Sequence, residues 1–282
     1  MLVYGTLKGI RDLAKKKALE YNDVLEVLFV YTALSFLFTI PISGNITGVP
    51  AKEMLLIAFK AFVIFIAFLF SFIAIKKMPV SLYGVIDLSR LLFSMTLGVF
   101  VLKETLKYNQ IIAMVLVAGG LLLLKYKPKS VRGSEDATEH VATIVYVMAF
   151  ASTFLNAISG TLDKILMSTG NVTSGQLQFW YTLFTLIYYG IYVVIKKYKI
   201  NFKTALKNPY IWVIAILFVV ADKCLFIANS YPESRVTVMT LLKQICCIVT
   251  IAGGKFIFKE KNTLQRLICA LVIIAGIVIA AL

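Results

Sequence analysis

The fold is decided by the stretch VSLYGVIDLSRLLFSMTLGVFVLKETLKYNQIIAMVLVAGGLLLL, residues Val80–Leu124, because the end of the chain repeats its layout. The counterpart is RVTVMTLLKQICCIVTIAGGKFIFKEKNTLQRLICALVIIAGIVIAAL, residues Arg235–Leu282. In each copy an apolar run ends in a hydrophobic-Lys-Glu turn, Leu102-Lys103-Glu104 in one and Phe258-Lys259-Glu260 in the other. A second apolar run follows in both copies and carries a patch of small residues. The paired turns and the shared order of elements predict an internal repeat.

Apolar runs fill the rest of the chain as well. The 282 residues are 60% hydrophobic with a mean hydropathy of +0.88, which is too apolar for a water-soluble core and indicates a membrane protein. About 20 helical residues cross the hydrocarbon core of a bilayer, and uninterrupted runs exclude the alternating strands of a barrel. We therefore expect an all-α polytopic membrane protein. The predicted spans are Asp23–Ser43, Met54–Ile75, Val80–Leu102, Asn109–Leu124, Val141–Met167, Ser174–Ile195, Pro209–Asn229, Val236–Phe258 and Leu264–Leu282.

The N-terminal segment Met1–Leu19 is more polar than the other runs and has two interpretations. It is either a basic helix at the membrane surface or a transmembrane helix that is shortened. The repeat favours the shortened helix, because FVYT at 29–32 has a counterpart in FWYT at 179–182, which follows the end of a helix in the second half. The charged residues of the segment are Lys8, Arg11, Asp12 and Lys15–Lys17.

Counting this segment gives about ten transmembrane helices in two five-helix repeats. The first repeat comprises residues 1–124, the polar linker 125–140 follows, and the second repeat comprises residues 141–282. An odd number of helices per repeat inserts the second copy in the opposite direction. Inverted repeats are a recurring plan of secondary transporters, whose substrate site lies between the repeats near the middle of the membrane.

Composition limits the function classes. The net charge of +15 comes from Lys and Arg residues that cluster at helix ends, as expected of membrane-edge anchors, so we do not expect nucleic acid as a partner. The four cysteines lie in apolar runs and are expected to be reduced. The only histidine, His140, lies in the linker. The sequence therefore predicts no metal site, no cofactor and no enzyme that depends on a histidine base.

Charged residues in the middle of the apolar runs are the candidates for a functional site, since each costs roughly 2.5–3.5 kcal/mol to insert into lipid. Asp87 and Arg90 are three residues apart and could neutralise each other on one helix face. Asp222 and Lys243 lie in successive helices and could form a bridge. Lys60, near the start of its run, is expected to extend to the lipid head groups. The candidate substrate-binding set is Asp87, Arg90, Asp222, Lys243, Gln244, Asn156 and Asp163.

The chain resembles the drug/metabolite transporter superfamily, specifically its ten-helix EamA-like branch. The resemblance rests on Pro79-Val80-Ser81 before the fourth helix, on the turn Leu102–Glu104 and on the Gly-rich fifth helix. It implies a secondary carrier that exports or exchanges small metabolites, amino acids or drugs. The chain departs from the family at Lys243-Gln244, where many relatives carry small or apolar residues.

The resulting hypothesis is a secondary active transporter, not an enzyme, that moves a small polar or anionic metabolite across the cell membrane by alternating access. The intramembrane basic groups outnumber the acidic ones, which favours an anionic or zwitterionic substrate. The expected partners are the lipid bilayer and this substrate, and a homodimer is compatible with the sequence. The alternative is an intramembrane enzyme acting on a lipid-linked or amphipathic substrate. Proton coupling through Asp87 or Asp222 and exchange driven by the substrate gradient are both compatible with the sequence.

The Lys and Arg residues are concentrated in alternate loops. The positive-inside rule places these loops in the cytoplasm and both termini outside. The resemblance instead implies that both termini lie inside, so two orientations are retained.

Overall fold

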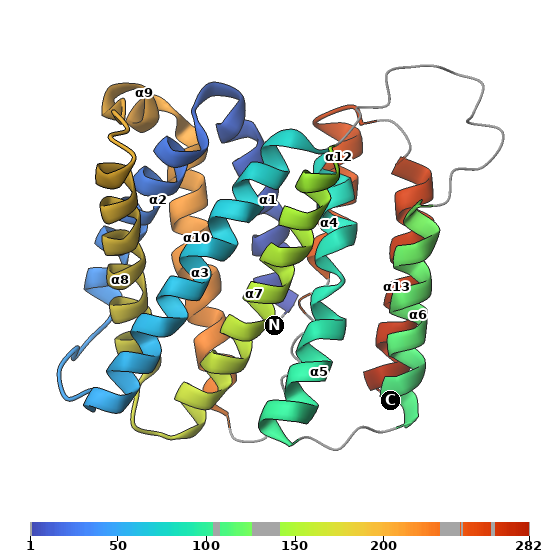
Figure 1. The fold of residues 1–282 in the computed structure, drawn as a ribbon, viewed down its shortest axis with the longest axis horizontal. Coiled ribbons are helices and arrows are strands. Elements are labelled where there is room, and N and C mark those ends of the chain that lie inside the picture. Colours follow the sequence, from blue (N-terminus) through green and yellow to red (C-terminus); the bar gives the residue numbers. More distant parts are fainter. Residues whose placement is uncertain are drawn as a thin grey trace.

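The computed structural model describes residues 2–103, 108–125, 142–231, 243, 245–260 and 263–281. All regular structure in these ranges is helical, and the helices pack side by side in a bundle (Figure 1). Six of the described helices are long and apolar enough to cross a membrane, and two shorter apolar helices accompany them. The expected all-α polytopic fold is confirmed. The helices are α1 Leu2–Tyr21, α2 Val24–Thr39, η1 Ile40–Ile42, α3 Ala51–Lys77, α4 Val80–Asp87, α5 Arg90–Leu102, α6 Tyr108–Lys125, α7 Thr143–Ser168, α8 Ser174–Ile195, α9 Phe202–Lys207, α10 Pro209–Ser230, α12 Ile245–Phe256 and α13 Thr263–Ala281.

The fourth predicted span is divided into two helices. α4 ends at Asp87 and α5 begins at Arg90. Between them the Leu88 N–H donates to the Val85 carbonyl, and the Leu91 N–H donates to the Leu88 carbonyl. These bonds join residues three apart and tighten the backbone as in a 3₁₀ turn. The break therefore places one helix end and one helix start in the middle of a membrane-length segment.

α1 lies inside the bundle rather than at its edge. The helix contains 20 residues, about the number that crosses a bilayer, and is longer than the shortened helix that the sequence predicts. It packs against α10 and α12, and its polar residues Lys8, Arg11 and Asp12 are buried. A helix at the membrane surface would expose these charges to water. The structure therefore contradicts the surface-helix interpretation.

The two halves of the chain run through the bundle in opposite directions (Figure 1). α1 and α3 rise toward the upper end in this view, whereas α7 and α10 descend. α3 packs against α7 as α1 packs against α10, and α3 packs against α8 as α10 packs against α2. α6 packs against α13, and α2 against α8. The set of pairs stays the same when each helix is replaced by its counterpart in the other half: α1 by α7, α2 by α8, α3 by α10, and α6 by α13. Most of the predicted linker, 126–140, lies outside the described residues.

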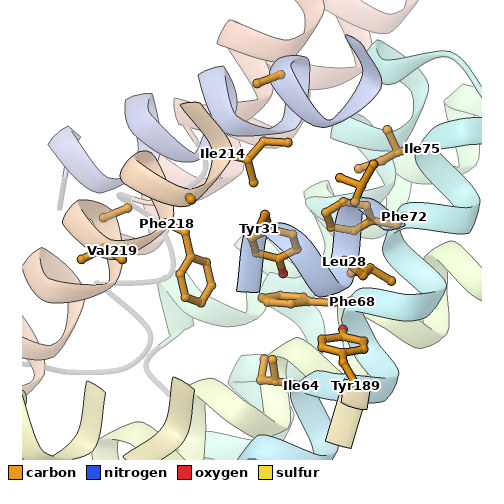
Figure 2. Close-up of a cluster of buried hydrophobic side chains, with 14 of the residues drawn as sticks. Leu28, Tyr31, Ile64, Phe68, Phe72, Ile75, Tyr189, Ile214, Phe218 and Val219 are labelled. Carbon is orange, nitrogen blue, oxygen red and sulfur yellow. The ribbon is translucent and has the colours of Figure 1, made fainter. Parts of the chain in front are cut away.

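An aromatic core holds α2, α3 and α10 together (Figure 2). The ring of Tyr31 stacks on Phe72 with a centroid distance of 5.5 Å and meets Phe218 edge-on at 5.9 Å. Tyr189 of α8 donates its hydroxyl to the Phe65 carbonyl at 3.1 Å, which satisfies the one polar atom of a buried ring. This core fixes the positions of the helices that carry the polar residues described below.

The second Lys-Glu turn meets the start of α4. The Glu260 carboxylate accepts hydrogen bonds from the Val80 N–H at 2.6 Å and from the Ser81 N–H at 3.2 Å. The Ser81 hydroxyl also donates to this carboxylate, and Arg266 forms an ion pair with it at 2.9 Å. N–H groups in the first turn of a helix have no partner within that helix. Glu260 therefore caps α4 from a segment that is 180 residues away in the sequence.

The lysine of each Lys-Glu turn adopts the same unusual backbone conformation. Lys103 follows α5 with a φ of 53°, and Lys259 follows α12 with a φ of 52°. Left-handed backbone costs a residue with a side chain roughly 1–2 kcal/mol. The same conformation thus recurs at equivalent points of the two halves.

Three connections meet at the upper end of the bundle. Asp23 lies between α1 and α2, Lys76 lies at the end of α3, and Tyr198 follows α8. Lys76 forms an ion pair with Asp23 at 3.0 Å, and the Tyr198 hydroxyl donates to the same carboxylate at 3.0 Å. The hydrogen bonds from Lys76 and Tyr198 hold the pKa of Asp23 below its ordinary value. Burial and the bond to Asp23 raise the pKa of Tyr198 to about 12.

Candidate functional site: a charged cavity at the centre of the bundle

The centre of the bundle contains a cavity of about 50 Å³. One buried water needs roughly 10–15 Å³, so the cavity has room for a few waters or for one compact chemical group. Its lining comes from α1, α3, α4, α5, α7, α8 and α10 and from Lys243. Both halves of the chain therefore contribute to it. The charged lining residues are Lys8, Arg11, Asp12, Lys15, Lys60, Asp87, Arg90, Asp163, Asp222 and Lys243.

Six of the seven predicted site residues line this one cavity. They come from four different described helices and from residue 243, and the folded chain brings them together. Their role in substrate binding stays a prediction. The seventh, Gln244, lies outside the described residues. The six are Asp87, Arg90, Asn156, Asp163, Asp222 and Lys243.

The expected pair between Asp87 and Arg90 does not form. The Asp87 carboxylate instead lies 2.6 Å from the ammonium of Lys8 in α1. Lys8 also contacts Asp12 at 3.3 Å, and Asp12 contacts Lys15 at 2.8 Å. The break between α4 and α5 explains the difference, because residues on either side of it do not share one helical face. The result is a buried chain of alternating charges, most of it on α1.

The expected bridge between Asp222 and Lys243 is also absent. Asp222 pairs with Arg11, whose Nη1 lies 3.7 Å from the carboxylate, a distance too long for a hydrogen bond. The Lys243 ammonium lies over the ring of Tyr4, 5.5 Å from its centroid. Cation–π contact stabilises a buried ammonium but does not neutralise it.

The predicted position of Lys60 is also wrong. It does not extend to the head groups, because it is 2% exposed and its ammonium lies 3.2 Å from Asp163. The same ammonium lies 3.5 Å from the ring centroid of Tyr181 and 5.4 Å from that of Phe226. An ion pair joins α3 to α7 here, as another joins α1 to α10. In both pairs the cation is in the first half and the carboxylate in the second.

The sequence analysis missed the contribution of α1. Lys8, Arg11, Asp12 and Lys15 all line the cavity, yet the polar N-terminal segment suggested a helix of uncertain role. A signal was present in the spacing, since residues three, four and seven apart occupy one face of a helix. A helix whose charges fall on one face and whose other residues are apolar is suited to line a polar cavity inside a membrane.

Two basic lining residues have no carboxylate partner in the described part of the chain. Arg90 is 9% exposed, and its Nε makes no hydrogen bond. Lys243 is 8% exposed; its ammonium lies over the ring of Tyr4, and no carboxylate of the described residues is within ion-pair distance of it. The Nε and Nη1 of Arg11 are likewise without hydrogen-bond partners. The cavity therefore presents cationic donors that the described residues leave without hydrogen-bond partners.

Neutral polar side chains complete the wall. The Tyr83 hydroxyl lies 2.8 Å from the Ser71 hydroxyl and 3.4 Å from the Ser152 hydroxyl, and so joins α3, α4 and α7. Asn156 donates its side-chain amide to the Ser152 carbonyl at 2.7 Å. Within the described residues, no three His, Cys, Asp or Glu side chains are grouped so that they could hold a metal ion.

Comparison with known proteins gives three findings. A solved crystal structure, described only as that of a protein, is 13% identical to this chain with a TM-score of 0.67, and the match covers 99% of this chain and 94% of the other. At this identity the likeness shows the fold alone. No curated protein matches the sequence. The sequence profile of the EamA-like transporter family matches residues 1–126. The first half of this chain, which supplies the unpaired Arg90 and the charged face of α1, is therefore an EamA-like transporter domain of the drug/metabolite transporter superfamily.

Proposed function

We propose that the protein is a secondary active transporter that moves a small polar or anionic metabolite across the cell membrane by alternating access. The observation that carries the proposal is the cavity, in which ten charged side chains of the described residues, from both halves of the chain, gather between membrane-length helices. Charged residues inside membrane proteins mark substrate or ion pathways because lipid alone would exclude them. The EamA-like domain in the first half supports transport as the general activity.

The two halves act as repeats in this proposal, with residues 1–124 as one unit and 141–282 as the other. Three features support this division: the opposite directions of α1 and α7, the helix contacts that are unchanged when the halves are exchanged, and the matching left-handed backbone of Lys103 and Lys259. Rocking of one repeat against the other would open the cavity to each side in turn.

In the part of the chain that the structure describes, two ion pairs cross between the halves and would change partners during such rocking. Arg11–Asp222 joins α1 to α10, and Lys60–Asp163 joins α3 to α7. Both are buried, so breaking either without a replacement is costly. A bound polar substrate supplies replacement contacts, which couples occupancy of the cavity to movement of the helices.

Counterflow in proteoliposomes tests the proposal. The purified protein is reconstituted, the vesicles are loaded with an excess of one unlabelled compound, and entry of the same labelled compound is followed for a panel of amino acids, organic anions and drugs. We expect saturable uptake with transient accumulation for at least one class, which a channel or an enzyme does not produce. Absence of counterflow across the whole panel would contradict the proposal.

A matched pair of variants on α1 links transport to the cavity. Arg11→Gln removes a lining cation, whereas Lys17→Gln removes a cation of the same helix that pairs with Glu20 outside the cavity. We expect Arg11→Gln to lower the rate roughly tenfold or more, equivalent to about 1.4 kcal/mol, and Lys17→Gln to leave it near the wild-type rate. Equal losses in both variants would indicate a general effect of charge on the folded protein.

A further inference from the structure

The charges of the described residues that line the cavity do not balance. Six of these residues are basic and four are acidic. Each of the four carboxylates has a cation within ion-pair distance: Asp12 and Asp87 contact Lys8, Asp163 contacts Lys60, and Asp222 contacts Arg11. The excess of two positive charges lies on Arg90 and Lys243, which form no ion pair with any described residue.

An excess of this kind is costly in the state that the structure shows. An uncompensated charge in a low-dielectric interior costs several kcal/mol, and Arg90 and Lys243 also repel one another. Arginine cannot relieve this cost by losing its proton. The structure therefore holds two cations in the cavity with no carboxylate of the described residues within ion-pair distance, and an anion from outside the chain would stabilise them.

The surroundings of Arg90 add to the preference for an anion. Arg90 is the first residue of α5, which has 13 residues and begins at the break within the fourth span. The start of a helix carries a partial positive charge that favours negative ligands, although the Leu91 and Phe93 N–H groups of this first turn already donate to backbone carbonyls. Discontinuous helices play this role for anionic groups in transporters. Arg11 provides further unfilled N–H donors in the same cavity.

We propose that the substrate is a compact dianion, a small molecule with two negative charges such as a short dicarboxylate or a phosphate monoester. The inference rests on the proposed transport function and specifies its substrate class. Two negative charges neutralise Arg90 and Lys243, whereas a zwitterion adds no net charge and leaves both cations uncompensated. The small volume of the cavity suits compact charged groups. The guanidinium of Arg90 can bind a carboxylate or a phosphate through two parallel hydrogen bonds.

A series of compounds that differ only in charge tests the proposal. Counterflow is measured with succinate, monomethyl succinate and succinamide, which share a carbon chain and carry two, one and no negative charges. Glycerol 3-phosphate and glycerol form a second pair that distinguishes phosphate from carboxylate, and alanine represents the zwitterions. We expect succinate or glycerol 3-phosphate to be transported at least roughly tenfold faster than its less charged analogue.

Variants of the two unpaired cations sharpen the test. Arg90→Gln and Lys243→Gln each leave one excess charge, so each is expected to lower the ratio of dianion to monoanion transport roughly tenfold. Lys203→Gln removes the same charge from exposed α9 and is expected to leave the ratio unchanged. The ratio is measured on the same vesicles, so it does not depend on how much of a variant folds.

The outcomes separate this inference from the proposed function. Counterflow of alanine, succinamide or monomethyl succinate at a rate equal to or above that of both dianions overturns the dianion assignment and leaves the carrier function in place. The dianion assignment is also overturned if Arg90→Gln and Lys243→Gln leave the ratio of dianion to monoanion transport unchanged. Absence of counterflow with these compounds overturns the assignment, and only the wider panel described above decides the carrier function.

Discussion

The ammonium of Lys8 in α1 lies 2.6 Å from the carboxylate of Asp87 at the end of α4, and both side chains are almost completely buried. The two residues are 79 positions apart in the sequence. Their contact attaches the polar face of α1 to the point at which the fourth span breaks. The first helix, the break and the cavity are thus parts of one arrangement.

Removing one member of this pair should be more harmful than removing both. Lys8→Met leaves the Asp87 carboxylate buried without a cation, which costs roughly 3–5 kcal/mol, whereas Lys8→Met combined with Asp87→Leu replaces the pair by apolar groups and is often close to neutral. Asp12 keeps Lys15 as a partner in both variants. Thermal unfolding of the protein in lipid nanodiscs measures the difference. A double variant less stable than the single variant would contradict the importance of this contact.

The contrast between α8 and α1 shows which features hydropathy can predict. The span Ser174–Ile195 coincides with α8, because polar residues flank it at both ends and it contains no charged residue. The charges of α1 reduce its hydropathy, although four of them line a cavity and do not face water or lipid. A hydropathy average over a window of residues does not record the direction in which each side chain points. Hydropathy therefore underestimates the contribution of α1 to the cavity.

The pairing of the cavity charges depends on tertiary packing in a way that sequence spacing does not reveal. Asp87 and Arg90 have the spacing of helical neighbours, and Leu88-Ser89 between them contains neither proline nor glycine to mark the break. Asp222 and Lys243 lie in neighbouring segments, yet Asp222 contacts Arg11 from the opposite end of the chain. The sequence identified residues that share the cavity. Their ion-pair partners could be identified only from the positions of α1 and α3 in the folded chain.

Loss of the Glu260 cap is expected to destabilise the start of α4. Glu260→Ala removes the acceptor of two first-turn N–H groups and the partner of Arg266, for which helix-cap data suggest a loss of about 1–2 kcal/mol. Glu20→Ala, which removes an exposed carboxylate paired with Lys17, serves as the control and should change stability by less than about 1 kcal/mol. Denaturation midpoints of the two variants compare them directly. Equal shifts would show that Glu260 does not act as a cap.

Gly84 and Gly119 provide a matched test of helix packing. A Cβ added at Gly84 would collide with the Thr250 side chain of α12, whereas one added at Gly119 meets no atom within 4 Å. Gly84→Ala should cost roughly 1–3 kcal/mol by overpacking. Gly119→Ala should stabilise the protein by about 0.5–1 kcal/mol, because alanine loses less backbone entropy in a helix. Thr250→Ala should restore part of the loss in the Gly84 variant, as measured by melting temperature. Similar melting temperatures for the two alanine variants would contradict this packing.

Asp23→Asn is expected to remove a contribution to the free energy of unfolding that depends on pH. Hydrogen bonds from Lys76 and Tyr198 hold the pKa of Asp23 below its ordinary value of about 3.9, so the folded protein binds this proton less tightly than the unfolded chain does. The contribution is therefore present above the ordinary pKa and is lost as the pH falls toward the lowered pKa. Melting temperatures of the two proteins, recorded from about pH 6 to about pH 3, should differ at the higher pH and converge on acidification. A difference of constant size over this range would show that the Asp23 carboxylate is not stabilised by the contacts that join the three connections.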